Sequence, residues 1–191
     1  VRTAGLIATE AHAGRATPSA ETLLPNSRAS ASPGRSGWDA GAVVEHTTGW
    51  DEIHLPEIAH NDPVPIALGD ALDFHTHSRT SRWPPGTRSA YTNSGAAVAA
   101  YIVEKISGVP YETYVGQHFL VPLKMRHTTF LNDAAYQKLG AITYDKNHHP
   151  VLYRHLLYRA AGGINSSPRE MANLLTMLLN EYRLNLMDSR T

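Results

Sequence analysis

The sequence predicts a single α+β domain in which helices predominate. Two segments carry strong helix signals, residues 95–107 and 168–180, whereas only residues 140–144 have the alternation and flanking turn of a strand. At 191 residues the chain is long enough to bury a substantial hydrophobic core. We therefore expect a mainly helical domain with little β-sheet.

The two ends of the chain lack these patterns. Residues 1–44 are rich in Ala, Ser, Gly, Arg, Pro and Thr and have no hydrophobic period, apart from a short helix expected at 8–15. Such a segment buries too little apolar surface to offset the entropy lost on ordering. We predict a poorly ordered N-terminal segment over 1–44, a packed domain over 45–180 and a tail over 181–191.

Within the domain, residues 46–82 are punctuated by Gly and Pro and predict loops, with one short helix at about 66–74. A long helix follows at 95–107, with Asn93 or Ser94 suited to cap its start. Its apolar residues recur at spacings of three and four and define one buried face: Val98, Tyr101, Ile102 and Ile106. Gly108, followed closely by Pro110, predicts the end of this helix.

Further helices are expected at 111–119 and 168–180, with a short extended piece at 127–130 and a strand and turn at 140–147. Ser167-Pro168-Arg169-Glu170 is a capping box with Pro at the first helical position, which predicts where the last helix begins. The apolar face expected for this helix consists of Met171, Leu174, Leu175, Leu178 and Leu179.

Tyr91 and Asn93 stand at the start of the long helix, where backbone N–H groups and the helix dipole also point. One interpretation is structural: the Tyr packs in a loop and the Asn caps the helix. The other is catalytic: the phenol moves a proton while the amide orients a substrate. A phenol needs help to do this at neutral pH, because its reference pKa is about 10.

Four landmarks occur in one order along residues 45–180: HTTG at 46–49, PPGTRSAYTNSGAAVAAYIVEKISGVPYETYV from Pro84, FLVPLKMRHTTF from Phe119, and AAGGI at 160–164. Together they resemble the serine β-lactamase and penicillin-binding-protein superfamily, in particular class C β-lactamases and β-lactamase-like (family VIII) esterases. The resemblance implies the helical lobe of a β-lactamase-like domain with most of its antiparallel sheet missing.

The same resemblance implies a serine hydrolase that acts on a small ester or amide through an acyl-enzyme, without a cofactor or metal. Tyr91 would then be the general base and acid, and Asn93 would orient the substrate. The family's nucleophile lies in a Ser-x-x-Lys motif, which this chain lacks: the residues three before its four Lys are Ile102, Val121, Ala135 and Thr143. The family's Lys-Thr-Gly strand motif is also absent after Gly163.

Three explanations remain for the incomplete catalytic set. The chain is an inactive piece of an ordinary serine hydrolase, or it is a paralogue that only binds, or Ser89 or Ser94 serves as an unusual nucleophile. The first explanation is favoured, because the family's sheet is built from both chain ends. It also predicts exposed apolar surface, and hence a tendency to self-associate.

A metal-dependent amidohydrolase is the alternative from another class. Asp73, His75 and His77 form a D-x-H-x-H pattern, and two His at i and i+2 of a strand can share a zinc ion. That barrel, however, needs about 250 residues.

Composition argues against several other classes of protein. Seventeen Lys plus Arg balance seventeen Asp plus Glu, so no basic excess favours nucleic acid, and the absence of Cys excludes disulfides and thiolate chemistry. The longest apolar run, 95–103, is far below the ~20 residues of a membrane span. The first fifteen residues do not indicate a signal peptide, and the compartment stays open, although family members are often extracytoplasmic.

Overall fold

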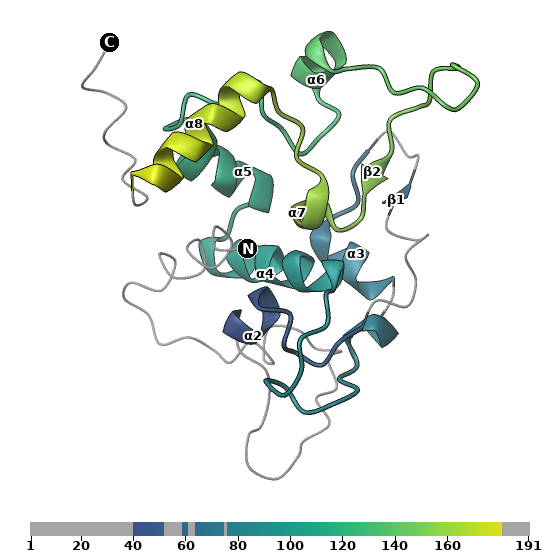
Figure 1. Ribbon diagram of the computed structural model, residues 1–191, viewed down its shortest axis with the longest axis vertical. Helices are drawn as coiled ribbons and strands as arrows, with labels where there is room; N and C mark the ends of the chain where they lie inside the picture. The colour runs from purple at the N-terminus through teal and green to yellow at the C-terminus, as the bar shows by residue number, and fades with distance from the viewer. Residues whose placement is uncertain (1–39, 52–58, 61–63, 75, 181–191) are drawn as a thin grey trace.

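A computed structural model describes residues 40–51, 59–60, 64–74 and 76–180 (Figure 1). The helix expected at 8–15 and the C-terminal tail over 181–191 lie outside these residues. Within them, helices dominate, and the sheet consists of one antiparallel pair, β1 (Ala59–His60) with β2 (His155–Leu156). The predicted fold class, a mainly helical α+β domain with little sheet, is therefore confirmed.

Helix α4 (Asn93–Ser107) runs through the middle of the molecule (Figure 1). It begins two residues before the predicted start, because Thr92, not Asn93 or Ser94, takes the extended backbone of the capping position (φ −147°, ψ 133°). It ends as predicted at Gly108, whose left-handed backbone (φ 74°) lets its N–H bond the Glu104 carbonyl.

Four short helices pack around α4: α2 (Ala40–Val44), α3 (Leu68–Asp73), α5 (Tyr111–Val115) and α7 (Arg159–Gly162). Val98 and Ile102 are buried, as the predicted apolar face requires. The alanines at 97, 99 and 100 are buried as well, so α4 is covered on more than one face.

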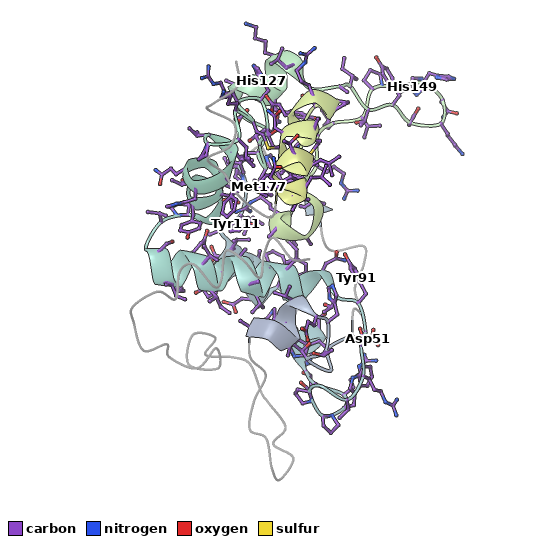
Figure 2. All side chains as sticks on the ribbon, turned by 60° about the vertical axis from the view of Figure 1, so that its left-hand side comes forward. Asp51, Tyr91, Tyr111, His127, His149 and Met177 are labelled. Carbon is purple, nitrogen blue, oxygen red and sulfur yellow. The ribbon has the colours of Figure 1, made fainter. Side chains whose placement is uncertain are left out.

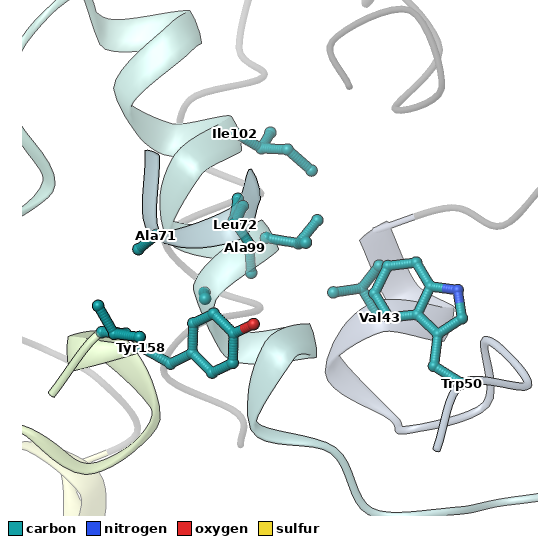
Figure 3. Close-up of a cluster of buried hydrophobic side chains, with 10 residues drawn as sticks. Val43, Trp50, Ala71, Leu72, Ala99, Ile102 and Tyr158 are labelled. Carbon is teal, nitrogen blue, oxygen red and sulfur yellow. The ribbon is translucent and has the colours of Figure 1, made fainter. Parts of the chain in front are cut away.

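The first core cluster lies between α2, α3, α4 and the segment leading into α7 (Figure 3). Val43 of α2 and Trp50 are fully buried in it, together with Leu72 of α3. The packed part of the chain therefore includes α2, which lies within the segment 1–44 that composition had assigned to poor order. Five residues are too few for composition to reveal such a helix.

A second cluster lies on the other side of α4, where α5 is followed by a π-helical turn, Gly116–Leu120. The single helix predicted at 111–119 is therefore two pieces. The Val121 N–H bonds the Gly116 carbonyl, one residue farther than in an α-helix, and this wider turn carries Phe119 into the core.

Helix α8 (Pro168–Leu179) begins as the capping box predicts, since the Ser167 hydroxyl accepts a bond from the Glu170 N–H. The predicted apolar face lies on this helix, but little of it is buried. The residue that packs inward is Met177, against Leu123 and Met125, whereas most of the predicted face is exposed. We call the exposed residues the outer face of α8: Met171, Leu175, Leu178 and Leu179.

Residues 140–152 form an exposed arm that projects from the body, with His149 near its tip (Figure 2). The strand predicted at 140–144 is reduced to a single bridge between Tyr144 and Pro150. Proline has no N–H to donate, and a lone hairpin without further strands is marginal in water. Before the arm lies α6 (Ala134–Leu139), capped by Asp133. The extended piece expected at 127–130 pairs at Thr129 with Asn165.

Candidate active site

Two loops that are far apart in the sequence run side by side at the N-terminal end of α4. One is the loop 46–49 and the other is the loop 81–92. Three backbone hydrogen bonds join them: Arg82 N to Gly49 O (2.9 Å), Gly86 N to Thr47 O (2.7 Å) and Ala90 N to His46 O (2.9 Å). The Ser81 hydroxyl adds a bond to the Thr48 carbonyl (2.8 Å). Two of the four landmarks in the sequence are therefore parts of one structural unit.

At Gly49 these loops lie too close together for a side chain. The Gly49 backbone is left-handed (φ +80°), and a Cβ atom built there would lie 2.3 Å from the Trp83 carbonyl oxygen. No real Cβ contact is that short, and the obstacle is backbone, so a side chain at this position would force the loops apart.

His46 is the residue that touches the catalytic candidates. It also has a left-handed backbone (φ 60°). Its Nδ1 accepts a bond from the Thr92 N–H (3.3 Å), and its ring lies 4.7 Å, centroid to centroid, from the ring of Tyr91. The sequence had marked residues 46–49 as a landmark but had assigned His46 no role.

Tyr91 and Asn93, the two predicted site residues, are brought together by the structure. The Tyr91 hydroxyl donates to the Asn93 Oδ1 (3.0 Å), and Asn93 is the first residue of α4. Tyr91 is 64% exposed, so its hydroxyl is open to a substrate (Figure 2). Tyr111, on α5, is buried, and burial raises the pKa of its phenol to about 12.

The hypothesis that Ser94 is a nucleophile is wrong on geometry. Ser94 is fully buried in the first turn of α4, and its Oγ lies 2.6 Å from the Oγ1 of Thr92, which is also buried. No substrate carbonyl can reach it there. Ser89 is exposed in the loop before Tyr91, so its candidacy stays a prediction.

The proposed metal pattern does not have the backbone it needs. Asp73 ends α3, and His77 lies in a 3₁₀ turn, Thr76–Arg79, rather than on a strand; His75 lies outside the described residues. Over the part of the chain that the structure describes, no group of three His, Cys, Asp or Glu could hold a metal ion. His77 is therefore not on the strand that the pattern requires, and no described residue supports the amidohydrolase alternative.

A buried ion pair lies at the other end of α4. Arg159 is buried and donates through Nε to Glu112 (2.5 Å) and through Nη1 to the Ile66 carbonyl (2.5 Å). Together with Lys105 these residues border a cavity of about 560 Å³. Lys105 lies twelve residues after Asn93, about 18 Å along the helix, so its ammonium is remote from Tyr91.

No helix among the described residues is long and apolar enough to cross a bilayer. The chain is similar to a probable hydrolase, M10, of Phoma sp., 27% identical over 134 residues, which are 70% of this chain and 22% of that protein. It is also similar to the protein flp of Staphylococcus aureus, 31% identical over 85 residues, 44% of this chain and 15% of that protein.

Solved structures share its fold. A mutant class C β-lactamase aligns with a TM-score of 0.69 at 20% identity, over 97% of this chain and 50% of that chain. An octameric penicillin-binding protein homologue from Pyrococcus abyssi aligns with a TM-score of 0.68 at 20% identity, over 95% of this chain and 43% of that chain. The chain thus spans half or less of these relatives. Because the family model described as Beta-lactamase matches residues 21–191, the chain belongs to the β-lactamase family.

Proposed function

We propose that the protein to which these residues belong is a serine hydrolase that cleaves an ester or a β-lactam amide through an acyl-enzyme. The observation that carries this proposal is the pairing of an exposed Tyr91 hydroxyl with the Asn93 amide at the start of α4. Family membership, and the printed description of the Phoma relative as a probable hydrolase, support it.

In this mechanism Tyr91 acts as a phenolate, stabilised by the Lys ammonium of the Ser-x-x-Lys segment, and its oxygen takes the proton of the serine hydroxyl as that serine attacks the substrate carbonyl. The same proton then passes from Tyr91 to the oxygen or nitrogen that leaves, and water later releases the acyl group. In the neutral phenol the Asn93 Oδ1 accepts a hydrogen bond from the Tyr91 hydroxyl, so the amide holds the Tyr91 oxygen in place at the start of α4. Its NH₂ group has donors that suit a substrate carbonyl.

The serine itself is not supplied by a Ser-x-x-Lys motif in residues 1–191, since the sequence contains none. Without the Lys, the nucleophile has no ammonium neighbour to assist its deprotonation, and Tyr91 cannot replace a nucleophile. We therefore propose that this chain by itself is catalytically silent. The Ser-x-x-Lys segment would have to come from additional polypeptide, because the chain spans about half of its structural relatives.

The first experiment incubates the purified chain with a fluorophosphonate probe and with a penicillin and measures intact mass. We expect no covalent adduct. Stoichiometric labelling of Ser89, abolished in Tyr91→Phe, would contradict the silence of the chain and make it a hydrolase in its own right.

The second experiment starts from the coding sequence on both sides, translated in every frame. If it encodes Ser-x-x-Lys ahead of His46, the longer protein is assayed with nitrophenyl esters and with a chromogenic cephalosporin. We expect Tyr91→Phe to lower kcat by roughly 10²–10⁴-fold, the usual range for a positioned proton donor. Tyr114→Phe on α5 removes a phenol hydroxyl elsewhere and is the matched control. Equal activity in the two variants, or reversible binding without turnover, would contradict the proposal.

A further inference from the structure

His46 contacts the catalytic loop in three different ways. Its carbonyl accepts from the Ala90 N–H (2.9 Å), its Nδ1 accepts from the Thr92 N–H (3.3 Å), and its ring lies against that of Tyr91 between those two residues. A single residue thus fixes the backbone on both sides of Tyr91 as well as the ring itself. The proton-transfer mechanism above leaves His46 unused.

The contact with Thr92 determines the protonation of the imidazole. A backbone N–H can only donate, so the Nδ1 that receives it must carry a lone pair and the ring proton must sit on Nε2. Thr92 is buried, so in the folded chain its N–H depends on the imidazole of His46 as acceptor. His46 is therefore required as an acceptor at this position.

The backbone conformation of His46 also indicates that its position is held by its contacts. A residue other than glycine rarely adopts φ near 60°, although Asn and His do so more often than most. Such a conformation persists only where the surroundings hold it in place. Here the bonds to Ala90 and Thr92 hold it, and they direct the ring toward Tyr91.

We propose that His46 is a positioning residue for Tyr91. As a neutral imidazole with its proton on Nε2, it anchors the Thr92 N–H and supports the phenol ring, and this keeps the Tyr91 hydroxyl on Asn93. The consequence for catalysis depends on the proposed function, whereas the anchoring itself stands on the contacts of His46 alone.

The test uses nuclear magnetic resonance of the chain as it exists, with three variants. His46→Ala removes the acceptor. His46→Asn restores it, because the Asn Oδ1 can occupy the place of Nδ1 and Asn tolerates a left-handed backbone. His118→Ala is the control, since His118 also stacks on a tyrosine, Tyr114, but on α5.

In the unmodified chain we expect the ¹⁵N shifts of His46 to report an unprotonated Nδ1 and a protonated Nε2. In His46→Ala the Thr92 amide should exchange with solvent roughly tenfold faster, as expected for the loss of one hydrogen bond, and the Tyr91 ring signals should move. His46→Asn should restore slow exchange, and His118→Ala should leave both readouts unchanged.

A proton on Nδ1 in the unmodified chain would overturn the proposal. So would unchanged Thr92 exchange in a folded His46→Ala variant, or failure of His46→Asn to restore it. If His46→Ala does not fold, the ¹⁵N shifts of His46 in the unmodified chain and the Thr92 exchange rate in His46→Asn still test the proposal.

In the longer protein, His46→Ala should lower kcat by roughly 10²-fold with little change in KM, the size of effect expected when a catalytic group is misplaced by about 1 Å. The two proposals fail separately. An inactive longer protein with intact Nδ1 anchoring would refute the hydrolase and leave the anchoring standing. A Tyr91-dependent hydrolase without that anchoring would do the reverse.

Discussion

At Gly49 the two loops of the site approach so closely that a methyl group has no space. We expect Gly49→Ala to destabilise the chain by more than the roughly 1–2 kcal/mol that a left-handed backbone costs an alanine. The additional cost arises because the new Cβ would meet the Trp83 carbonyl at 2.3 Å. Urea unfolding followed by circular dichroism measures the difference.

Gly86 provides the matched control for that experiment. It has the same φ of +80°, but a Cβ there would have nothing within 4 Å. Gly86→Ala should therefore show the backbone cost alone. Equal destabilisation by the two substitutions would mean that the contact between the loops does not contribute.

Glu170 is a buried carboxylate that fastens the start of α8 to the segment 127–128. It accepts bonds from the Thr128 hydroxyl (2.6 Å) and from the His127 N–H (3.0 Å), and its Oε1 lies 2.9 Å from the His127 Nδ1. Burial by itself would raise the pKa of Glu170, but the hydrogen bonds from Thr128 and His127 outweigh it, and the pKa lies below its ordinary value.

A carboxyl whose pKa is depressed in the folded state stabilises that state above its unfolded pKa of about 4.3. This stabilisation is lost as the pH falls through the lower, folded-state pKa. We expect Glu170→Gln to destabilise the chain by roughly 1–3 kcal/mol at pH 7, the cost of disrupting hydrogen bonds to a buried charged group.

The difference between Glu170→Gln and the unmodified chain should shrink as the pH falls below about 4.3, because the carboxyl is protonated first in the unfolded chain and then, at its lower folded-state pKa, in the folded chain. Urea midpoints at several pH values test this. A difference that stays constant from pH 7 to pH 3 would show that the carboxylate charge is not what fastens α8.

Among the elements, the helices whose ends carry recognisable capping residues could be predicted from the sequence. Gly108 determines where α4 ends, because its N–H donates to the Glu104 carbonyl. Ser167 determines where α8 begins, because its hydroxyl accepts from the Glu170 N–H. Both bonds join residues three or four positions apart, so a short stretch of sequence is enough to predict them. The structure ends α4 at Ser107 and begins α8 at Pro168, the residues that were predicted. The helix at 66–74 was also anticipated and is observed as α3, Leu68–Asp73.

Elements stabilised by distant contacts could not be predicted in this way. Helix α2 is five residues long and depends on burying Val43 against α4, whereas α8 shows an apolar pattern whose partner is not among the described residues. Likewise, Tyr91 and Asn93 share one short motif and were identified together. The contact of His46 with Thr92 spans 46 positions and left no local signal.

For the whole molecule, the outer face of α8 leaves apolar side chains in water, with Leu175 55% and Leu179 75% exposed. Contiguous exposed apolar surface favours association. We expect the chain to sediment as a concentration-dependent mixture of species, and we expect the double variant Leu175→Lys with Leu179→Lys to shift that mixture toward the monomer. Analytical ultracentrifugation measures both.

Val64 is as exposed, at 70%, but precedes α3 instead of lying on α8. Val64→Lys is therefore the control and should leave the distribution of species unchanged. If it reduces association as much as the α8 variants do, general hydrophobicity rather than the outer face is responsible.

The exposed arm over residues 140–152 has a consequence for how the polypeptide can be divided. Its tip is closed locally by Asp145, whose Oδ1 accepts from the N–H groups of Asn147 and His149 (2.8 and 2.9 Å). The bonds that join the chain before the arm to the chain after it lie elsewhere: Thr129 pairs with Asn165, and Glu170 binds His127 and Thr128.

Fragments 1–146 and 147–191, produced together as separate polypeptides, should therefore purify as one complex, with the bonds across the Thr129–Asn165 bridge intact. A break between Thr47 and Thr48 would instead fall inside the loop that is hydrogen-bonded to residues 81–92, and a chain cut there should unfold at lower urea concentration than a chain cut at 146–147. Lys146–Asn147 is thus a permissive position for splitting the molecule or for inserting a reporter, and the site around Tyr91 would remain whole on one of the two pieces.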